Sequence, residues 1–325
     1  MEESRRRSAI AATLVLAACG SSTPPPVGSR VAPALVAVLA AADGARAPWR
    51  CAAPDVPEVV TETLALGDRT WKLAGHALSL EGTGAITIGV IADAGGAAPA
   101  TLAALGRLRG KLSNIDLVLV LGGMGSTAAE LQASLGALGD RATWPIVVIP
   151  GDLEPATAAV TAIAALRARG QPVLDGRLIR RVDVPGATIA TLPGASDASR
   201  LVAGAEGCGY RASDIAAVFA DLTPRTGLRI LATAEAPRVT VRGEPTGDIA
   251  LVPSAGQEID ISLHGPIEPS ATPARTGTRD GSAAPLTPGT SDATTRLPGP
   301  PRAATAGVLT VNGTTWRWRP IADAD

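Results

Sequence analysis

Five acidic residues follow short apolar stretches of the chain, at positions where carboxylates can do chemistry. They are Asp93, Asp152, Glu154, Glu235 and Glu268. Oxygen ligands are those that Mg²⁺ and Ca²⁺ prefer, and Mg²⁺ often uses only one or two carboxylates together with water. Carboxylates also accept hydrogen bonds from the amides at the start of a helix. The sequence allows one weakly held divalent metal here, but we expect Asp93 and Asp152 to cap the helices that follow them.

Three corners of the chain share one sequence pattern. Each has a short run of β-branched residues and Leu, then glycine, and then a stretch of helical character; they span residues 88–96, 117–125 and 146–154. This pattern is typical of the strand-loop-helix units of an α/β sheet. Ligands of such sheets bind beyond the carboxyl ends of the strands, so the corners are well placed for a functional site.

The order of these corners resembles the calcineurin-like metallophosphoesterases, over roughly residues 84–268 together with the last predicted hairpin. That family carries Asp-x-His after the first strand, Gly-Asp after the second and Gly-Asn-His-Glu after the third. A single His and a Gly-His-x-His motif follow later strands. These side chains hold two metal ions that clamp a phosphoryl group and activate a water. The resemblance implies an α/β sandwich with mixed sheets flanked by helices.

The chain departs from the family pattern at most of the metal ligands. Asp93 is kept, but Gly95 stands in place of the first His and Gly123 in place of the bridging Asp. The later motifs depart as well: the third has Asp152 and Leu153, the position after the later strand has Ala234, and the last motif has Pro266 and Glu268. The whole chain contains only two His residues, His76 and His264, which are too few for the family site. We therefore expect no catalytic residues and no cofactor, with Asp93 and Asp152 as vestigial metal ligands.

The other motifs favour structural roles. The Gly-Gly-Met-Gly-Ser corner at 122–126 could hold a phosphate with its backbone amides. It lacks the Lys of a P-loop and the spacing of the dinucleotide fingerprint, so a tight turn is the better interpretation. No Ser-His-Asp arrangement is evident; we expect His264 to be a hydrogen-bonded loop residue and His76 to lie at the surface.

Strands and helices alternate along the chain and must position the corners. We predict strands at residues 86–93, 116–121, 145–150, 178–184, 187–192, 228–233 and 260–263, and helices at 99–112, 126–138, 155–167 and 212–222. This alternation indicates a mostly parallel sheet covered by helices. Residues 58–81 read as a hairpin with its turn at Gly67-Asp68, and residues 307–319 as a closing hairpin across Asn312-Gly313.

The composition is that of a chain able to bury a sizeable core. It has 325 residues, of which 46% are hydrophobic, 18% charged and only 2% aromatic, with a formal net charge of −1. The core must therefore consist of Ala, Val, Leu and Ile, with Trp71, Trp144, Trp316 and Trp318 as the few large side chains. The near-neutral charge gives no reason to expect nucleic acid as a partner.

The N-terminus resembles the signal of a bacterial lipoprotein. Arg5, Arg6 and Arg7 form a basic region, residues 9–18 are apolar but too short to span a bilayer, and Leu-Ala-Ala-Cys ends the segment at Cys19. We expect residues 1–18 to be removed and Cys19 to carry lipid, since two or more acyl chains anchor a protein stably. An ordinary signal peptide with an incidental cysteine is the alternative. No Asp follows Cys19, so the resemblance favours the outer membrane, facing the periplasm.

Two cysteines, Cys51 and Cys208, remain once Cys19 is lipidated. An even number in an oxidising compartment favours a disulfide between them. Two buried free thiols are the alternative.

The predicted organisation places a tether at residues 19–30, a helix and hairpin at 31–83, and the phosphoesterase-like domain at 84–325, with a Pro- and Thr-rich loop at 269–306. We expect a lipid-anchored binding or structural module without hydrolytic activity, with an unidentified protein or small molecule as partner. The alternatives are a divergent hydrolase with one metal at Asp93 and Asp152, and a periplasmic receptor that binds a small ligand at the glycine corners.

Overall fold

A computed structural model of the chain describes residues 61–112, 114–152, 154–196, 207–222, 224–235, 239–241, 244–246, 251, 259–265, 275–278, 289–290 and 305–321. These residues form two large mixed β-sheets and four helices. The α/β class with mixed sheets is therefore confirmed.

One sheet contains the strands that lead into the three glycine corners. Its order is β14-β17-β16-β4-β5-β6-β7, and the bounds are β4 (Ile86–Ala92), β5 (Leu117–Leu121), β6 (Ile146–Ile149), β7 (Val173–Asp175), β14 (Arg275–Thr278), β16 (Thr305–Asn312) and β17 (Thr315–Pro320). Strands β4 to β7 run parallel. Strand β16 pairs antiparallel with β4, and β17 continues the sheet from β16. Strands from the end of the chain therefore cover the edge of the parallel part.

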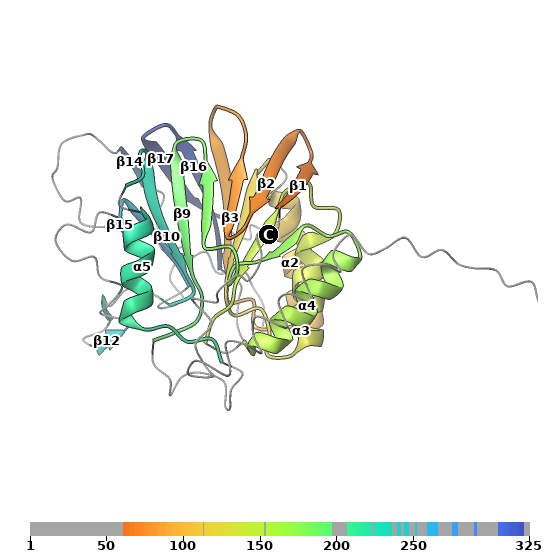
Figure 1. Cartoon of the computed structure of the whole chain (residues 1–325). Coiled ribbons are helices and arrows are strands. Elements are labelled where there is room, and N and C mark those ends of the chain that lie inside the picture. The colour runs from red at the N-terminus through yellow and green to blue at the C-terminus, as the bar shows by residue number, and fades with distance from the viewer. Residues whose placement is uncertain are drawn as a thin grey trace, which may run out of the picture.

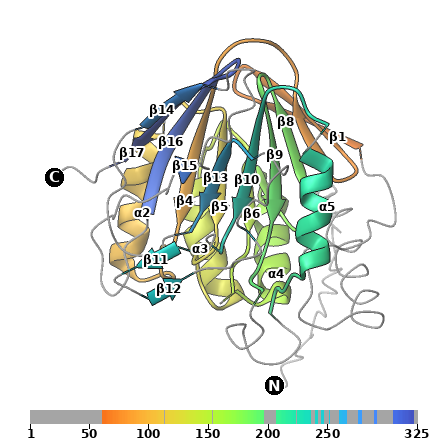
Figure 2. The ribbon, with the colours of Figure 1, turned by 90° about the vertical axis from the view of Figure 1, so that its left-hand side faces the viewer.

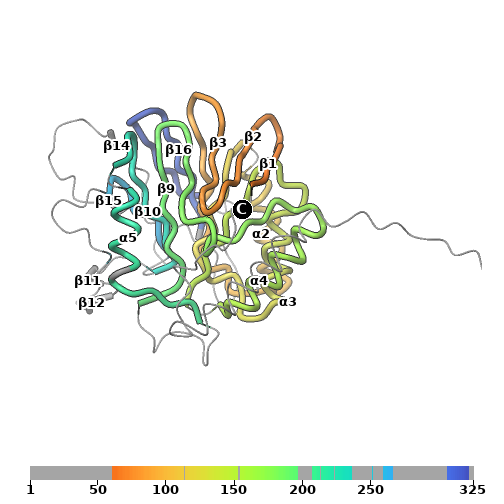
Figure 3. The backbone as a smooth tube through the Cα atoms, viewed as in Figure 1, coloured from red at the N-terminus to blue at the C-terminus, as the bar shows by residue number. Residues whose placement is uncertain are grey.

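The second sheet begins with the first described residues. Its order is β1-β2-β3-β8-β9-β10-β13-β15, with β1 (Thr61–Leu66), β2 (Arg69–Ala74), β3 (Ala77–Leu80), β8 (Arg181–Val184), β9 (Ala187–Leu192), β10 (Leu228–Thr233), β13 (Ile261–His264) and β15 (Gly289–Thr290). Strand β3 pairs with β8, so residues 61–80 are part of this sheet. Figure 3 shows these early strands in orange beside the green strand β9. A separate two-stranded ribbon joins β11 (Val239–Val241) and β12 (Glu244–Thr246).

The helices lie on the outer faces of the two sheets. Helices α2 (Pro99–Lys111), α3 (Ala128–Gly139) and α4 (Ala156–Ala168) follow β4, β5 and β6, and α5 (Ala212–Leu222) precedes β10. Figures 1 and 2 show α5 over β9 and β10, on the side of the molecule away from α2, α3 and α4. Ile215 and Phe219 of α5 pack on Ala190 and Leu231 of these two strands.

The main hydrophobic core lies between the two sheets, and its two largest side chains are tryptophans. Trp71 and Trp318 are both fully buried in it. A methyl group at Gly307 would lie 2.1 Å from Cζ2 of Trp318, so only glycine lets this indole ring pack on the neighbouring strand. Trp144 belongs to the helix layer, and Trp316 packs at the border of the main core. The few tryptophans therefore fill large spaces in an aliphatic core.

Most predicted elements are present, but several boundaries and strands differ. The 58–81 segment holds three strands instead of two, because Gly75 has a φ of +58° and forms a second turn. The closing hairpin turns at Gly313-Thr314, one residue later than predicted. The stretch 269–306 was predicted to lack periodic structure, yet it contributes β14 and β15 by pairing with distant strands. Such pairings depend on partners that no local pattern identifies.

Within the described residues, none of the helices is long and apolar enough to cross a membrane. The predicted tether and the predicted helix at 31–42 lie outside the described residues.

Candidate functional site

The corners after β5 and β6 of one sheet meet the ends of β10 and β13 of the other sheet at one end of the molecule. A methyl group placed on Gly122 would lie 3.0 Å from Cα of Gly151 and 3.1 Å from Cβ of Ala234. One placed on Gly265 would lie 2.6 Å from the carbonyl oxygen of Ala234. Backbone atoms therefore fill the centre of this end, where a ligand of an α/β sheet would bind.

Gly123 stands where the family has its bridging Asp, and it lies directly against Asp93. A Cβ atom at Gly123 would be 2.5 Å from Cα and 2.9 Å from Oδ1 of Asp93. The two loops are joined by backbone hydrogen bonds, from Asp93 to Gly122 at 3.0 Å and from Gly95 to Gly123 at 2.8 Å. Gly123 has a φ of +73° and Asp93 has a φ of +54°, which is unusual for a residue other than glycine. A bridging carboxylate does not fit at position 123.

Glu154 is the most buried carboxyl group at this end, with 1% of its surface exposed. Its Oε1 accepts a hydrogen bond from the Met124 amide at 2.7 Å, and its Oε2 accepts one from the Gly151 amide at 2.5 Å. The side chain therefore joins the loop after β5 to the loop after β6. Neither oxygen faces solvent.

The pKa of Glu154 is raised to about 7 because burial removes water from the charged form. The backbone amides of Gly151, Met124 and Gly123 act in the opposite direction, and the negative charge of Asp152 raises the pKa further. Desolvation is the largest of these effects. The carboxyl group of Glu154 is therefore partly protonated near neutral pH.

Glu235, after β10, holds the neighbouring loops in a different way. Its Oε2 accepts hydrogen bonds from the Tyr210 hydroxyl at 2.7 Å and from the Ser196 amide at 2.9 Å. Glu235 and Tyr210 are both buried. Nearby, Nδ1 of the buried His264 lies 2.8 Å from the carbonyl oxygen of Gly265. His264 was predicted to be a loop residue, but it ends strand β13, whereas His76 is exposed as predicted. These contacts hold the loops together, and they do not direct a reactive group toward solvent.

The prediction that Asp93 and Asp152 cap helices is wrong. The N-cap residue of α2 is Ala98 and that of α4 is Pro155, and neither of these residues makes a side-chain capping hydrogen bond. The chain instead enters α2 through Pro99, which suits the first turn of a helix because its missing amide leaves no donor to satisfy. Asp93 and Asp152 are both half-buried.

Sequence reasoning missed the capping carboxylate that this end does contain. Thr127 is the N-cap of α3 and accepts from the Glu130 amide at 3.2 Å, while Oε2 of Glu130 accepts from the amide and hydroxyl of Ser126, each at 2.9 Å. These bonds lower the pKa of Glu130. Thr127 and Glu130 have the spacing of a capping box, so the signal was present in the sequence.

Several predicted positions cannot be placed in this geometry. Leu153, Pro266, Glu268, Cys19 and Cys51 lie outside the described residues. Among the residues that are described, no group of three or more His, Cys, Asp or Glu side chains is arranged to hold a metal ion. The two-metal centre that the resemblance implied therefore has no counterpart among the described side chains of this corner.

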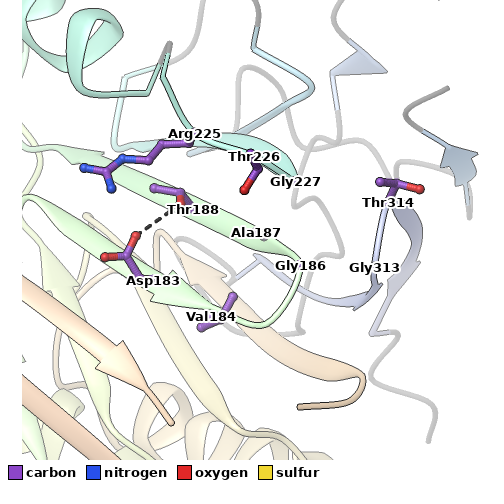
Figure 4. A pocket seen from close by; sticks show the side chains of 10 residues that line it. All are labelled: Asp183, Val184, Gly186, Ala187, Thr188, Arg225, Thr226, Gly227, Gly313 and Thr314. Atoms are coloured by element: carbon purple, nitrogen blue, oxygen red, sulfur yellow. Dashed lines mark hydrogen bonds between the residues drawn. The ribbon is translucent and has the colours of Figure 1, made fainter. Parts of the chain in front are cut away.

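A pocket of about 420 Å³ lies at the opposite end of the strands (Figure 4). It is lined by residues 183, 184 and 186–188 around the β8–β9 turn, 225–227 before β10, and 313–314 between β16 and β17. Thr188 donates a hydrogen bond of 3.1 Å to Asp183 at its edge. None of the predicted site residues lines this pocket.

Comparison with known proteins finds no matching family model and no matching curated protein. Among solved structures, a purple acid phosphatase from yellow lupin seeds is 9% identical with a TM-score of 0.45, covering 79% of this chain and 57% of that one. The GAP50 anchor in the inner membrane complex of Plasmodium is 9% identical with a TM-score of 0.43, covering 74% and 85%. A phosphopantetheinyl hydrolase from Mycobacterium tuberculosis is 15% identical with a TM-score of 0.37, covering 60% and 86%. All three TM-scores are below 0.5, and the fold of this chain is therefore described by its own strand pairing.

Replacing Gly123 by Asp introduces the residue that metallophosphoesterases carry after their second strand, but it should not create a metal site. We expect the variant to lose about 2–4 kcal/mol of unfolding free energy, because the new side chain overlaps Asp93 and requires a positive φ. Urea unfolding with and without Mn²⁺ measures this loss and any stabilisation by metal.

Gly106 supplies the control for this variant. A Cβ atom there meets nothing within 4 Å inside α2, so Gly106→Ala should stabilise the protein by about 0.5–1 kcal/mol. Stability of Gly123→Asp equal to that of the parent would show that the corner has room for the carboxylate.

Proposed function

We propose that this chain is a lipid-anchored, phosphoesterase-like binding or structural module without hydrolytic activity. The observation that carries the proposal is the contact between Gly123 and Asp93, where the backbone of one loop fills the position of the bridging carboxylate.

Hydrolysis of phosphoesters by this kind of fold requires two metal ions about 3.5–4 Å apart, which lower the pKa of a water and neutralise charge on the phosphoryl oxygens. In this chain no carboxylate can bridge two metals at position 123. The buried Glu154 binds backbone amides with both of its oxygens. The chain also contains only two His residues. These features together support an inactive corner.

We expect generic phosphomonoesters and phosphodiesters to remain intact when the purified protein is incubated with Mn²⁺, Mg²⁺, Zn²⁺ or Fe. Release of the chromogenic product, measured against a protein-free blank, tests this directly. A double variant, Asp93→Ala with Asp152→Ala, serves as the matched control, and circular dichroism verifies its fold. Metal-dependent turnover that disappears in the double variant would instead establish the single-metal hydrolase that the sequence left open.

Anchoring through Cys19 is the second part of the proposal and rests on the Leu-Ala-Ala-Cys stretch. In a bacterial host, Cys19→Ser should move the protein out of the outer-membrane fraction or leave its signal peptide uncleaved, because no thiol remains to carry lipid. Fractionation followed by immunoblotting measures both effects. A variant that fractionates and migrates like the parent would disprove the anchor.

The predicted disulfide between Cys51 and Cys208 is the third part. Cys208 is fully buried, and Cys51 lies outside the described residues. Cys51 is the remaining cysteine once Cys19 carries lipid. Peptide mapping without reductant should recover the two cysteine peptides as one linked species. Quantitative alkylation of both thiols after acid quenching would contradict the bridge.

A further inference from the structure

The pocket at the end of the strands away from the glycine corners is formed by three turns whose backbones touch. A methyl group on Gly186 would lie 2.6 Å from the carbonyl oxygen of Gly313, and one on Gly227 would lie 2.6 Å from the carbonyl oxygen of Gly186. The Gly186 carbonyl also accepts a hydrogen bond of 2.8 Å from the Leu228 amide. Because these turns belong to both sheets and hold one another in place, the pocket is formed before any ligand binds.

One side of the pocket carries a group of four side chains whose charges balance. Nε of Arg181 lies 2.8 Å from Oδ2 of Asp183, and its Nη1 lies 3.4 Å from Oδ1 of Asp221. Nη2 of Arg225 lies 3.3 Å from the same oxygen of Asp221. Asp183 and Arg225 line the pocket beside Thr188, as Figure 4 shows. A ligand in the pocket therefore meets one carboxylate and one guanidinium group on a side without net charge.

The pocket offers several hydrogen-bonding groups that the protein itself leaves unused. Thr226 and Thr314 are exposed, and their hydroxyl groups make no hydrogen bond with any residue in the described part of the chain. Arg225 binds Asp221 through Nε and Nη2, which leaves its Nη1 to donate. Each oxygen of Asp183 accepts one hydrogen bond and has a further lone pair. The lining can therefore both donate hydrogen bonds to a ligand and accept them from it.

We propose that this pocket binds a neutral ligand with several hydroxyl groups, such as a small saccharide. Its volume of about 420 Å³ is in the range of small-molecule sites, and hydroxyl groups both donate and accept hydrogen bonds, as the lining requires. An anion would face the carboxylate of Asp183, and a cation would face the guanidinium group of Arg225. An apolar ligand would remove water from both groups without replacing its hydrogen bonds. The proposal goes beyond the proposed function, since it does not depend on whether the glycine corner has hydrolytic activity.

Titrating the purified protein with sugars that differ in charge tests the proposal. Glucose and maltose are neutral, glucuronate carries a carboxylate, and glucosamine carries an ammonium group in mildly acidic buffer. We expect glucose or maltose to shift the NMR signals of the Gly186, Gly227 and Gly313 amides in a saturable way, and the two charged sugars to bind more weakly. The amide of Gly106, which lies in α2 and does not line the pocket, serves as the internal reference.

Two threonine variants separate binding at the pocket from binding elsewhere. Thr226→Val removes one unused hydroxyl group and keeps the shape of the side chain, so it should weaken binding of the neutral sugar roughly 2–10-fold, the net value of one hydrogen bond. Thr63→Val, at an exposed position of β1, is the matched control and should bind like the parent protein. Because both positions are exposed, both variants should fold.

The absence of saturable shifts with both glucose and maltose would overturn the proposal. Binding of a charged sugar at least as tight as that of the neutral sugars would overturn it as well, and so would an unchanged affinity in Thr226→Val. Saturable shifts that weaken in Thr226→Val and persist in Thr63→Val would establish the site.

Discussion

The contact between the glycine loops at the carboxyl ends of β5, β6, β10 and β13 is the constraint on which the arrangement of this end depends. Gly122 approaches both Gly151 of its own sheet and Ala234 of the facing sheet, and Gly123 rests on Asp93. Side chains at these glycines would separate the two sheets at the end where they converge. At position 123 the absence of a side chain is what lets the backbones of the two loops meet.

The sequence predicted the larger features of the fold because they follow from local patterns. The bounds predicted for α5 and β10 match the structure, and the three corners lie together as expected from parallel strands. The helix caps were predicted wrongly because an acidic residue shortly before a helix need not be the residue at which the helix begins. Helix α2 begins at Pro99, several residues after Asp93. The burial of Glu154 could not be predicted, because it results from amides contributed by a loop 30 residues earlier in the chain.

Glu130 and Glu154 show how one corner gives two identical side chains different electrostatic properties. Glu130 is at the entry of α3 with hydroxyl and amide donors around it, which favour the charged form. Glu154 has comparable amide donors, but its isolation from water is the larger effect. Hydrogen bonds alone therefore do not set the ionisation of a carboxyl group at this end; solvent exposure decides between the two outcomes.

The pairing of β16 with β4 has a consequence for how the chain acquires its structure. Thr305 lies opposite Ala92, so 213 residues separate the two partners (305 − 92). During synthesis, β4 emerges long before the strand that covers its edge, and an uncovered apolar edge is prone to pair with other chains. Contacts this distant in sequence also slow folding, because a large loop must close before they form. Strands β16 and β17 therefore complete a sheet whose parallel strands are synthesised much earlier. Without this hairpin the edge of β4 stays uncovered, and the chain is then prone to aggregate.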